Sequence, residues 1–494
     1  MRVGDGVESE ALALGVDLGT GSARAFVLTG TGRRLGGVRL PYRWRTGLDG
    51  SVEGDADRIV ELVYAAMDGA TATLWPGATV SAVGFSALWH TLLGVDGRGR
   101  PVTPVYGWSD TRSSAAAAAL RAELDEAGVH RRTGVVLHPS YPPAKLRWLR
   151  DAKPELFGRA SRWLSLPEYL WLRLTGEHVV DLSVAAASGL LDQRAVEWDG
   201  EVLEVCGVGV EQLGKVLVGA GEAAFPGSGV AGAARWPRLR DALWRLPVGD
   251  GACANIGSGC HDPTGAALSV GTSAALRVVV PGGWRSPPRG LWCYRMDRDR
   301  TVLGGAISNG GVVKEWLENL LRLPARGAEL DALLDAREPG GHGLAVLPFL
   351  AGERSPHWPL SAAATFSGIS LATSALDVFQ AGLESVAYRL VLLRRLLREA
   401  VPEAVAVVAS GGALRRSPAW AQLVADALGE PLLLTSDPEA SSRGAALLAL
   451  EAAGVLDVAG VQAPPSTTIE PDPERHLLHA RALERHSRLE TRLR

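Results

Sequence analysis

Apolar and polar residues alternate along this chain with two periodicities, and each half of the chain uses them in a similar order. Near the start, residues 11–17, 23–28 and 35–44 have the apolar content of three neighbouring strands. The stretch from Arg58 has the spacing of an amphipathic helix, and the stretch from Thr79 reads as a buried strand. Strands followed by a crossing helix and a further strand predict an α/β layer. The second half repeats this order and ends in a charged amphipathic helix.

Other segments separate these two layers. Helical spacing also marks residues 113–127, 144–150 and 167–174. The stretch 219–239 is irregular and rich in Gly, Pro and Ala, so we expect surface loops there, shortly before the second half begins.

The two halves share one short phrase, GVDLGTGSARAFVL at 15–28 and ALSVGTSAALRVVV at 267–280. Each copy runs an apolar stretch into Gly-Thr, then Ser, then another apolar stretch, which predicts a hairpin with a tip of small residues. Such a tip offers backbone N–H groups and hydroxyls that can bind phosphate oxygens. Because the tip recurs in equivalent places, we expect a site between the halves in which both tips bind phosphate groups.

Two acidic residues lie close to these phrases. Asp17 stands two residues before Gly19, at the mouth of the first hairpin, where a carboxylate could hold Mg²⁺ directly or through water. Asp250 is flanked by Gly249 and Gly251, which would let a ligand approach its carboxylate closely. The alternative for Asp250 is the N-cap of a helix over the residues that follow it, and spacing alone leaves both interpretations open.

Length and composition narrow the class of protein. A chain of 494 residues is too long for one ordinary core, so we expect two domains. Hydrophobic residues at 47% and a net charge of −3 are typical of a globular protein without an electrostatic footprint for nucleic acid or an anionic membrane. No apolar run reaches about 18 residues, so we expect neither a membrane span nor a signal peptide, and a cytoplasmic location.

Four longer stretches resemble motifs of one family, the FGGY carbohydrate kinases. They are DLGTGSAR (17–24), SYPPAKLRWLRD (140–151), ATFSGISLATSALDVFQAGLE (364–384) and ASGGALRRSPAWAQLVADALGEPL (409–432). The resemblance implies an α/β fold of two ribonuclease-H-like, actin-like ATPase domains with an interdomain cleft. It further implies a sugar-binding N-terminal domain over 1–247 and a nucleotide-binding C-terminal domain with a terminal helix over 248–494.

The resemblance also assigns roles by position. It makes Asp250 the catalytic base and makes Asp17 the residue that orients Mg²⁺ and the phosphates of ATP. It implies that the ATP site is formed by Asp17, Gly19, Thr20, Ser22, Gly271, Thr272, Ser273, Gly310, Gly311, Gly411, Gly412 and Ala413.

The acceptor site is less closely defined. In the family, the dipeptide at Trp89 and His90 lies in the sugar pocket, and Trp108 follows in the same region. The likeness is greatest to the gluconate-kinase branch, which implies acceptor contacts from Trp89, His90, Asp110, Arg112, Asp181 and Ser183. His90 and Arg112 could neutralise a sugar-acid carboxylate, since arginine presents a two-pronged donor. Alternatively, Arg112 pairs with Asp110 and only braces its loop.

The predicted function is therefore ATP-dependent phosphorylation of a hydroxyl on a small sugar or sugar acid. Gluconate or a related aldonate is favoured, and xylulose, another ketose or a polyol is the alternative acceptor. Two other classes stay open, namely a sugar-binding regulator without chemistry and an actin-like filament or chaperone ATPase. A homodimer is also left open.

Overall fold

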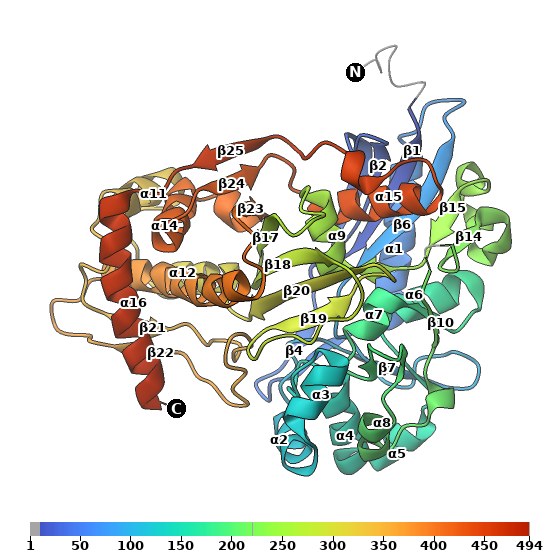
Figure 1. Ribbon diagram of the computed structural model, residues 1–494, viewed down its shortest axis with the longest axis horizontal. Helices are drawn as coiled ribbons and strands as arrows, with labels where there is room; N and C mark the ends of the chain where they lie inside the picture. The colour runs from blue at the N-terminus through green and yellow to red at the C-terminus, as the bar shows by residue number, and fades with distance from the viewer. Residues whose placement is uncertain (1–9, 220, 494) are drawn as a thin grey trace.

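Two mixed β-sheets with the same central topology form the framework of the molecule, in a computed structural model that describes residues 10–219 and 221–493 (Figure 1). In the first sheet, β1 pairs antiparallel with β2 and parallel with β6, and β2 pairs with β3. In the second, β17 pairs antiparallel with β18 and parallel with β23, and β18 pairs with β20. The predicted α/β fold of two similar halves is therefore confirmed.

The first sheet has the order β14-β15-β6-β1-β2-β3, with β16 also on β6, and the second has the order β19-β20-β18-β17-β23-β24-β25. Their strands are β1 (Leu12–Leu18), β2 (Ser22–Thr29), β3 (Arg34–Pro41), β6 (Val80–Ala87), β14 (Ala224–Pro226), β15 (Leu243–Arg245), β16 (Val248–Gly249), β17 (Gly265–Val270), β18 (Ala274–Pro281), β19 (Trp292–Arg295), β20 (Arg300–Ile307), β23 (Ala406–Ser410), β24 (Leu432–Thr435) and β25 (Ser466–Ile469).

Short strands pair outside these sheets: β4 (Arg45–Thr46), β5 (Val52–Gly54), β7 (Leu93–Val95), β8 (Val105–Tyr106), β9 (Arg162–Leu164), β10 (Val179–Asp181), β11 (Leu191–Asp192), β12 (Glu197–Trp198), β13 (Lys215–Leu217), β21 (Ala345–Leu347) and β22 (Thr365–Ser367).

Helices cover the sheets and form an added lobe below the first one (Figure 1). The helices of the first half are α1 (Ala56–Thr71), α2 (Ser114–Glu123), α3 (Glu126–Thr133), α4 (Pro142–Ala152), α5 (Pro154–Arg159), α6 (Leu166–Thr175), α7 (Leu182–Ala186) and α8 (Gly200–Cys206). Those that follow are α9 (Asp250–Gly257), α10 (Gly311–Leu320), α11 (Gly327–Asp335), α12 (Ala375–Ala400), α13 (Gly412–Arg415), α14 (Pro418–Leu428), α15 (Ala440–Ala452) and α16 (Pro473–Leu493). None of the described helices is both long enough and apolar enough to cross a bilayer.

Most strands and helices lie where the apolar pattern predicts them, with one clear difference. The helix predicted over 113–127 is two helices, because Leu124 adopts an extended conformation that ends α2 and Asp125 then occupies the N-cap position of α3. The loops predicted over 219–239 contain the short strand β14 and several single turns of 3₁₀ helix, while position 220 lies outside the described residues.

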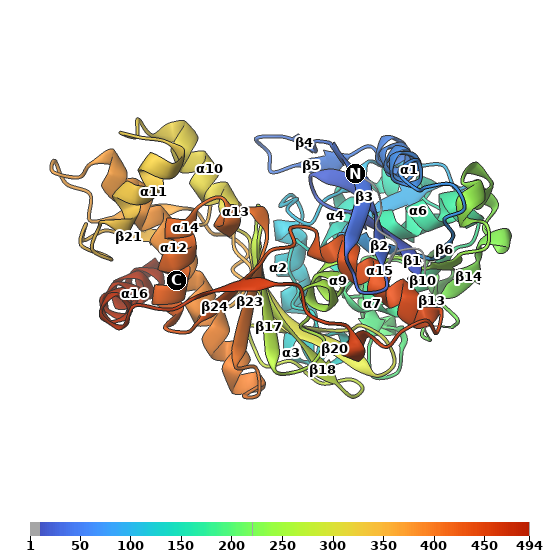
Figure 2. The same ribbon diagram turned by 90° about the horizontal axis from the view of Figure 1, so that it is seen from above.

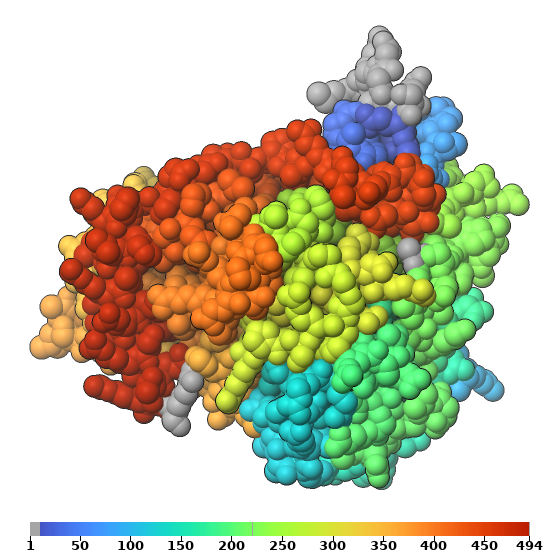
Figure 3. Space-filling model, viewed as in Figure 1, coloured from blue at the N-terminus to red at the C-terminus, as the bar shows by residue number. Residues whose placement is uncertain are grey.

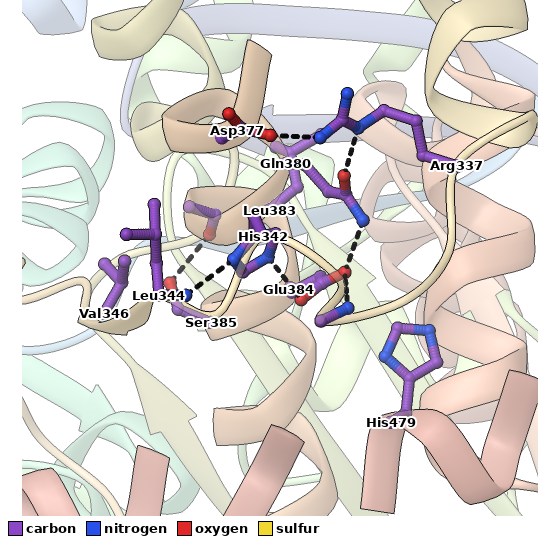
Figure 4. A network of polar contacts seen from close by, with 12 residues as sticks. Arg337, His342, Leu344, Val346, Asp377, Gln380, Leu383, Glu384, Ser385 and His479 are labelled. Carbon is purple, nitrogen blue, oxygen red and sulfur yellow. Dashed lines mark hydrogen bonds and ion pairs between the residues drawn. The ribbon is translucent and has the colours of Figure 1, made fainter. Parts of the chain in front are cut away.

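A buried polar network in the second half connects the loop before β21 to helix α12 (Figure 4). The Glu384 carboxylate on α12 accepts hydrogen bonds from the Gly340 N–H and the Gln380 amide. His342 Nδ1 accepts the Leu344 N–H, so its Nε2 carries the proton that faces Glu384 at 3.1 Å. These bonds anchor the loop before β21 on α12.

Helices α9 and α15 join the two halves. They pack against each other, and α15 also covers β1 and β6 of the first sheet (Figure 2). A Cβ on Gly444 would lie 1.8 Å from the carbonyl oxygen of Cys253, and one on Gly84 would lie 2.0 Å from that of Ala445. The space-filling view shows the red segment that contains α15 lying directly against the blue residues of the first half (Figure 3). At these contacts between the two halves, backbone therefore packs directly against backbone, with no side chain between them.

We expect Gly84→Ala to destabilise the protein by about 2 kcal/mol or more, because the obstructing atom is backbone and α15 must move off the sheet. The measurement is the urea midpoint of unfolding. Gly158→Ala is the matched control, since nothing lies within 4 Å of a Cβ there and alanine favours a helix. Equal midpoints for the two variants would contradict the proposed tightness of the joint.

Candidate active site

A cavity of about 840 Å³ lies between the two halves. Its wall includes both Gly-Thr hairpin tips, the start of α9 and the turn from β23 into α13. The sequence-predicted residues on this wall are Asp17, Gly19, Thr20, Asp250, Gly271, Thr272, Ser273, Gly311, Gly411, Gly412 and Ala413. Residues from both halves thus meet around one space large enough for a nucleotide and a small acceptor.

Each hairpin tip is held in shape by neighbouring backbone and side chains. At the first tip the Trp44 indole donates to the Thr20 carbonyl at 2.6 Å. At the second, the N–H groups of Gly310 and Gly311 donate to the carbonyls of Thr272 and Gly271 at 3.0 and 2.7 Å. Those two glycine N–H groups therefore position the second tip, and Gly310 lies behind the cavity wall.

Asp17 lies within a chain of charges that crosses the cleft. One carboxylate oxygen accepts the Ser86 hydroxyl at 2.9 Å, and the other pairs with Arg24 at 3.1 Å. Arg24 also pairs with Glu439 of the second half at 3.1 Å. Burial raises the pKa of Asp17, and the Arg24 charge opposes that rise. Ser22, which the sequence predicts to contact ATP, is fully buried, and its hydroxyl accepts a hydrogen bond from Arg24 Nε. It is not on the described cavity wall.

Asp250 is the first residue of α9, and Gly249 occupies the N-cap position. The N-cap interpretation of Asp250 is therefore wrong, because its own backbone is already helical. Burial raises the pKa of the Asp250 carboxyl to about 6, and the Arg277 charge is the largest influence that lowers it. The carboxyl still ionises below neutral pH, so it can accept a proton at pH 7.

The cavity wall opposite the first tip is formed where β23 ends. Gly411 has a φ of +104°, which strains any residue with a side chain, and a Cβ there would lie 2.5 Å from the Val270 carbonyl oxygen. The short helix α13 starts at the next residue and borders the cavity, together with Arg415 and Arg416.

Among the predicted acceptor residues, Trp89 and His90 line a separate small pocket and are not on the described wall of this cavity. A Cβ on Gly251 would lie 2.2 Å from the Trp89 ring, so the indole packs directly under the segment that carries Asp250. His90 has a φ of +62°, and its Nδ1 lies 2.9 Å from the Ala187 carbonyl oxygen. Burial holds the pKa of His90 well below its usual range, so the imidazole is neutral.

The other predicted acceptor residues are engaged in local bonds outside the described cavity wall. Arg112 pairs with Asp110 at 2.6 Å and with Glu53 at 2.9 Å. This arrangement agrees with the alternative in which Arg112 pairs with Asp110 and braces its loop. Asp181 caps α7, and the Ser183 hydroxyl accepts the Gly249 N–H at 3.2 Å, which fixes the residue before Asp250.

Three residues that the site predictions omit are important here. Trp108, to which the sequence assigns no contact, is on the cavity wall. Arg277 also lines the cavity, and Arg354 stacks on Trp108, with its guanidinium carbon 4.3 Å from the ring centroid. A single arginine inside the apolar strand 274–280 is a signal that could have identified Arg277, whereas no local pattern marks Arg354.

No three His, Cys, Asp or Glu side chains in residues 10–219 and 221–493 are grouped to hold a metal ion by themselves. A Mg²⁺ ion that binds with nucleotide needs only one or two carboxylates, because phosphates and waters complete its shell. Asp17 fits that requirement, since it lines the cavity and a Cβ on Gly19, at the first tip, would lie 3.4 Å from its Oδ2.

Known proteins resemble this chain over nearly its whole length. Residues 12–225 match the N-terminal domain and 266–453 the C-terminal domain of the FGGY family of carbohydrate kinases. The gluconokinase of Bacillus subtilis (strain 168) is 28% identical over 90% of this chain and 88% of its own.

Solved structures share the same two-domain α/β fold. The gluconate kinase from Lactobacillus acidophilus superposes with a TM-score of 0.87 at 25% identity, covering 98% of each chain. A xylulose kinase from the same organism has a TM-score of 0.87 at 26% identity, again covering 98% of each chain. The two family matches together span most of the sequence, and the chain therefore belongs to the FGGY family of carbohydrate kinases, which transfer phosphate from ATP to a sugar.

Proposed function

We propose that this carbohydrate kinase phosphorylates a small sugar acid, with gluconate favoured, and that Asp250 is its catalytic base. The observation that carries the proposal is the position of the Asp250 carboxyl on the same cavity wall as both Gly-Thr tips. A base in that position can reach an acceptor hydroxyl while the tips hold the nucleotide phosphates. A regulator without chemistry would need no carboxylate there.

The reaction follows from these groups. A sugar hydroxyl is a poor nucleophile, so Asp250 accepts its proton as the oxygen–phosphorus bond forms and the bond to ADP breaks. The hydroxyls of Thr20 and Thr272 and the N–H groups of the tips donate to phosphate oxygens. Asp17 would hold Mg²⁺, which when bound neutralises phosphate charge.

The acceptor class rests on the relatives. A gluconokinase and a solved gluconate kinase are similar to this chain over most of its length, which supports a sugar acid. The xylulose kinase superposes equally well, so a ketose is the second candidate.

We expect Asp250→Asn to retain binding of ATP and acceptor but to lose about 10² to 10⁴-fold in turnover, because the amide cannot accept the hydroxyl proton. ADP release measures turnover and calorimetry measures binding. Near-normal turnover in this variant would remove Asp250 from the role of base.

We expect turnover to depend on pH through the same carboxyl. Since burial raises the pKa of Asp250 to about 6 in the ligand-free protein, the base is protonated and inactive below that value, and kcat/KM for the acceptor should rise as pH passes through about 6. Circular dichroism at each pH serves as the control for unfolding. A kcat/KM that stays constant between pH 5 and pH 7 contradicts this assignment.

We expect a panel of aldonates, pentuloses and polyols to show the highest kcat/KM with an aldonate, measured as acceptor-dependent ADP release. A ketose with the highest value would favour the second candidate. Release that no acceptor stimulates would contradict the proposed reaction.

A further inference from the structure

Two arginine side chains lie near Asp250 without an ion pair to any described carboxylate. Arg277 on β18 and Arg354 in the loop after β21 are each 7% exposed, and the charges of both lower the pKa of Asp250. Neither forms an ion pair with any carboxylate in the described part of the chain, unlike Arg112 with its two partners. Asp250 is the main opposite charge that acts on Arg277, and it also acts on Arg354. These two buried cations thus share a carboxylate that forms an ion pair with neither, so an anionic ligand would stabilise this arrangement.

Neutral groups hold the Arg277 guanidinium in place. Its Nε donates to the Asn255 side-chain oxygen at 3.2 Å, and one terminal nitrogen donates to the Ser269 hydroxyl at 2.8 Å. The other terminal nitrogen forms no hydrogen bond with a described residue, and it is not fully enclosed by the protein. Because Arg277 lines the cavity, this side of its planar fork is available to a ligand.

Arg277 is on the acceptor side of the base. A Cβ on Gly251 would lie 3.2 Å from the Arg277 side chain and 2.2 Å from the Trp89 ring, so these two residues flank Gly251 directly after Asp250. The nucleotide tips have their own cation in Arg24, which pairs with Asp17. Arg354 adds a second positive charge behind Trp108, and its buried Nε has no partner in the described structure.

We infer that Arg277 binds the carboxylate of the acceptor and thereby selects sugar acids over neutral sugars. The inference rests on the proposed function, because it names the group that recognises the acceptor of that reaction. Arginine suits this task, since its fork donates two parallel hydrogen bonds to a carboxylate. It also replaces Arg112, the arginine expected from the sequence, which is engaged with Asp110 and Glu53.

The test compares gluconate with gluconamide, which has the same hydroxyls but no charge. We expect the wild type to prefer gluconate about 100-fold in kcat/KM and Arg277→Met to reduce that preference to less than about 5-fold, mainly through KM for gluconate. Arg277→Lys should retain part of the preference. Arg112→Met is the matched control and should leave the ratio of the two acceptors unchanged.

Other results overturn the inference. An equal loss with both acceptors, or a raised KM for ATP, would mean that Arg277 acts on the phosphoryl group or on Asp250. A wild type that phosphorylates only neutral acceptors keeps the kinase reaction but excludes carboxylate recognition, whereas no turnover with any acceptor means that the proposed function itself fails. If Arg277→Met does not fold, Ser269→Ala removes the 2.8 Å bond and should lower the preference about 3-fold or more. An unchanged preference in that variant would also overturn the inference.

Discussion

The packing of α9 against α15 determines where the chemistry can take place. The two helices meet at backbone distance because glycines stand at the contact points, and α15 then covers the first sheet at equally short range. Asp250 begins α9 directly after β16, which pairs with β6. Its carboxyl is therefore tied to the first sheet by a strand and to the second half by a helix. This arrangement holds the carboxyl at the boundary between them.

Positive and negative side chains are distributed unevenly along the cleft. Asp17, Arg24 and Glu439 form a chain of alternating sign that connects the halves. Asp250 lies between the negative charge of Asp17 and the positive charge of Arg277, and these have opposite effects on its pKa. Arg354 adds a second positive charge that lowers the pKa of Asp250.

Aromatic side chains from both halves meet beside the segment that carries Asp250. The hydroxyls of Tyr141 and Tyr294 lie 2.7 Å apart, one from each half, and Trp89 packs edge-on against Tyr294. The Trp89 ring lies directly against Gly249 and Gly251, so rigid aromatic packing supports the segment that carries Asp250. Shape and charge beside Asp250 therefore come from residues that are far apart in the chain.

The sequence by itself determined the strands, most helices and the repeated hairpin, because periodicity reports which face of an element is buried. The likeness of its motifs to one family also predicted the cleft and the importance of Asp17 and Asp250. Only the tertiary structure decided that α15 covers the first sheet, that Glu53 and Asp110 engage Arg112, and that Arg277 forms no ion pair with a carboxylate among the described residues. Local patterns specify conformation and burial, whereas the partner of a charged side chain depends on which distant backbone brings its group within a few ångströms.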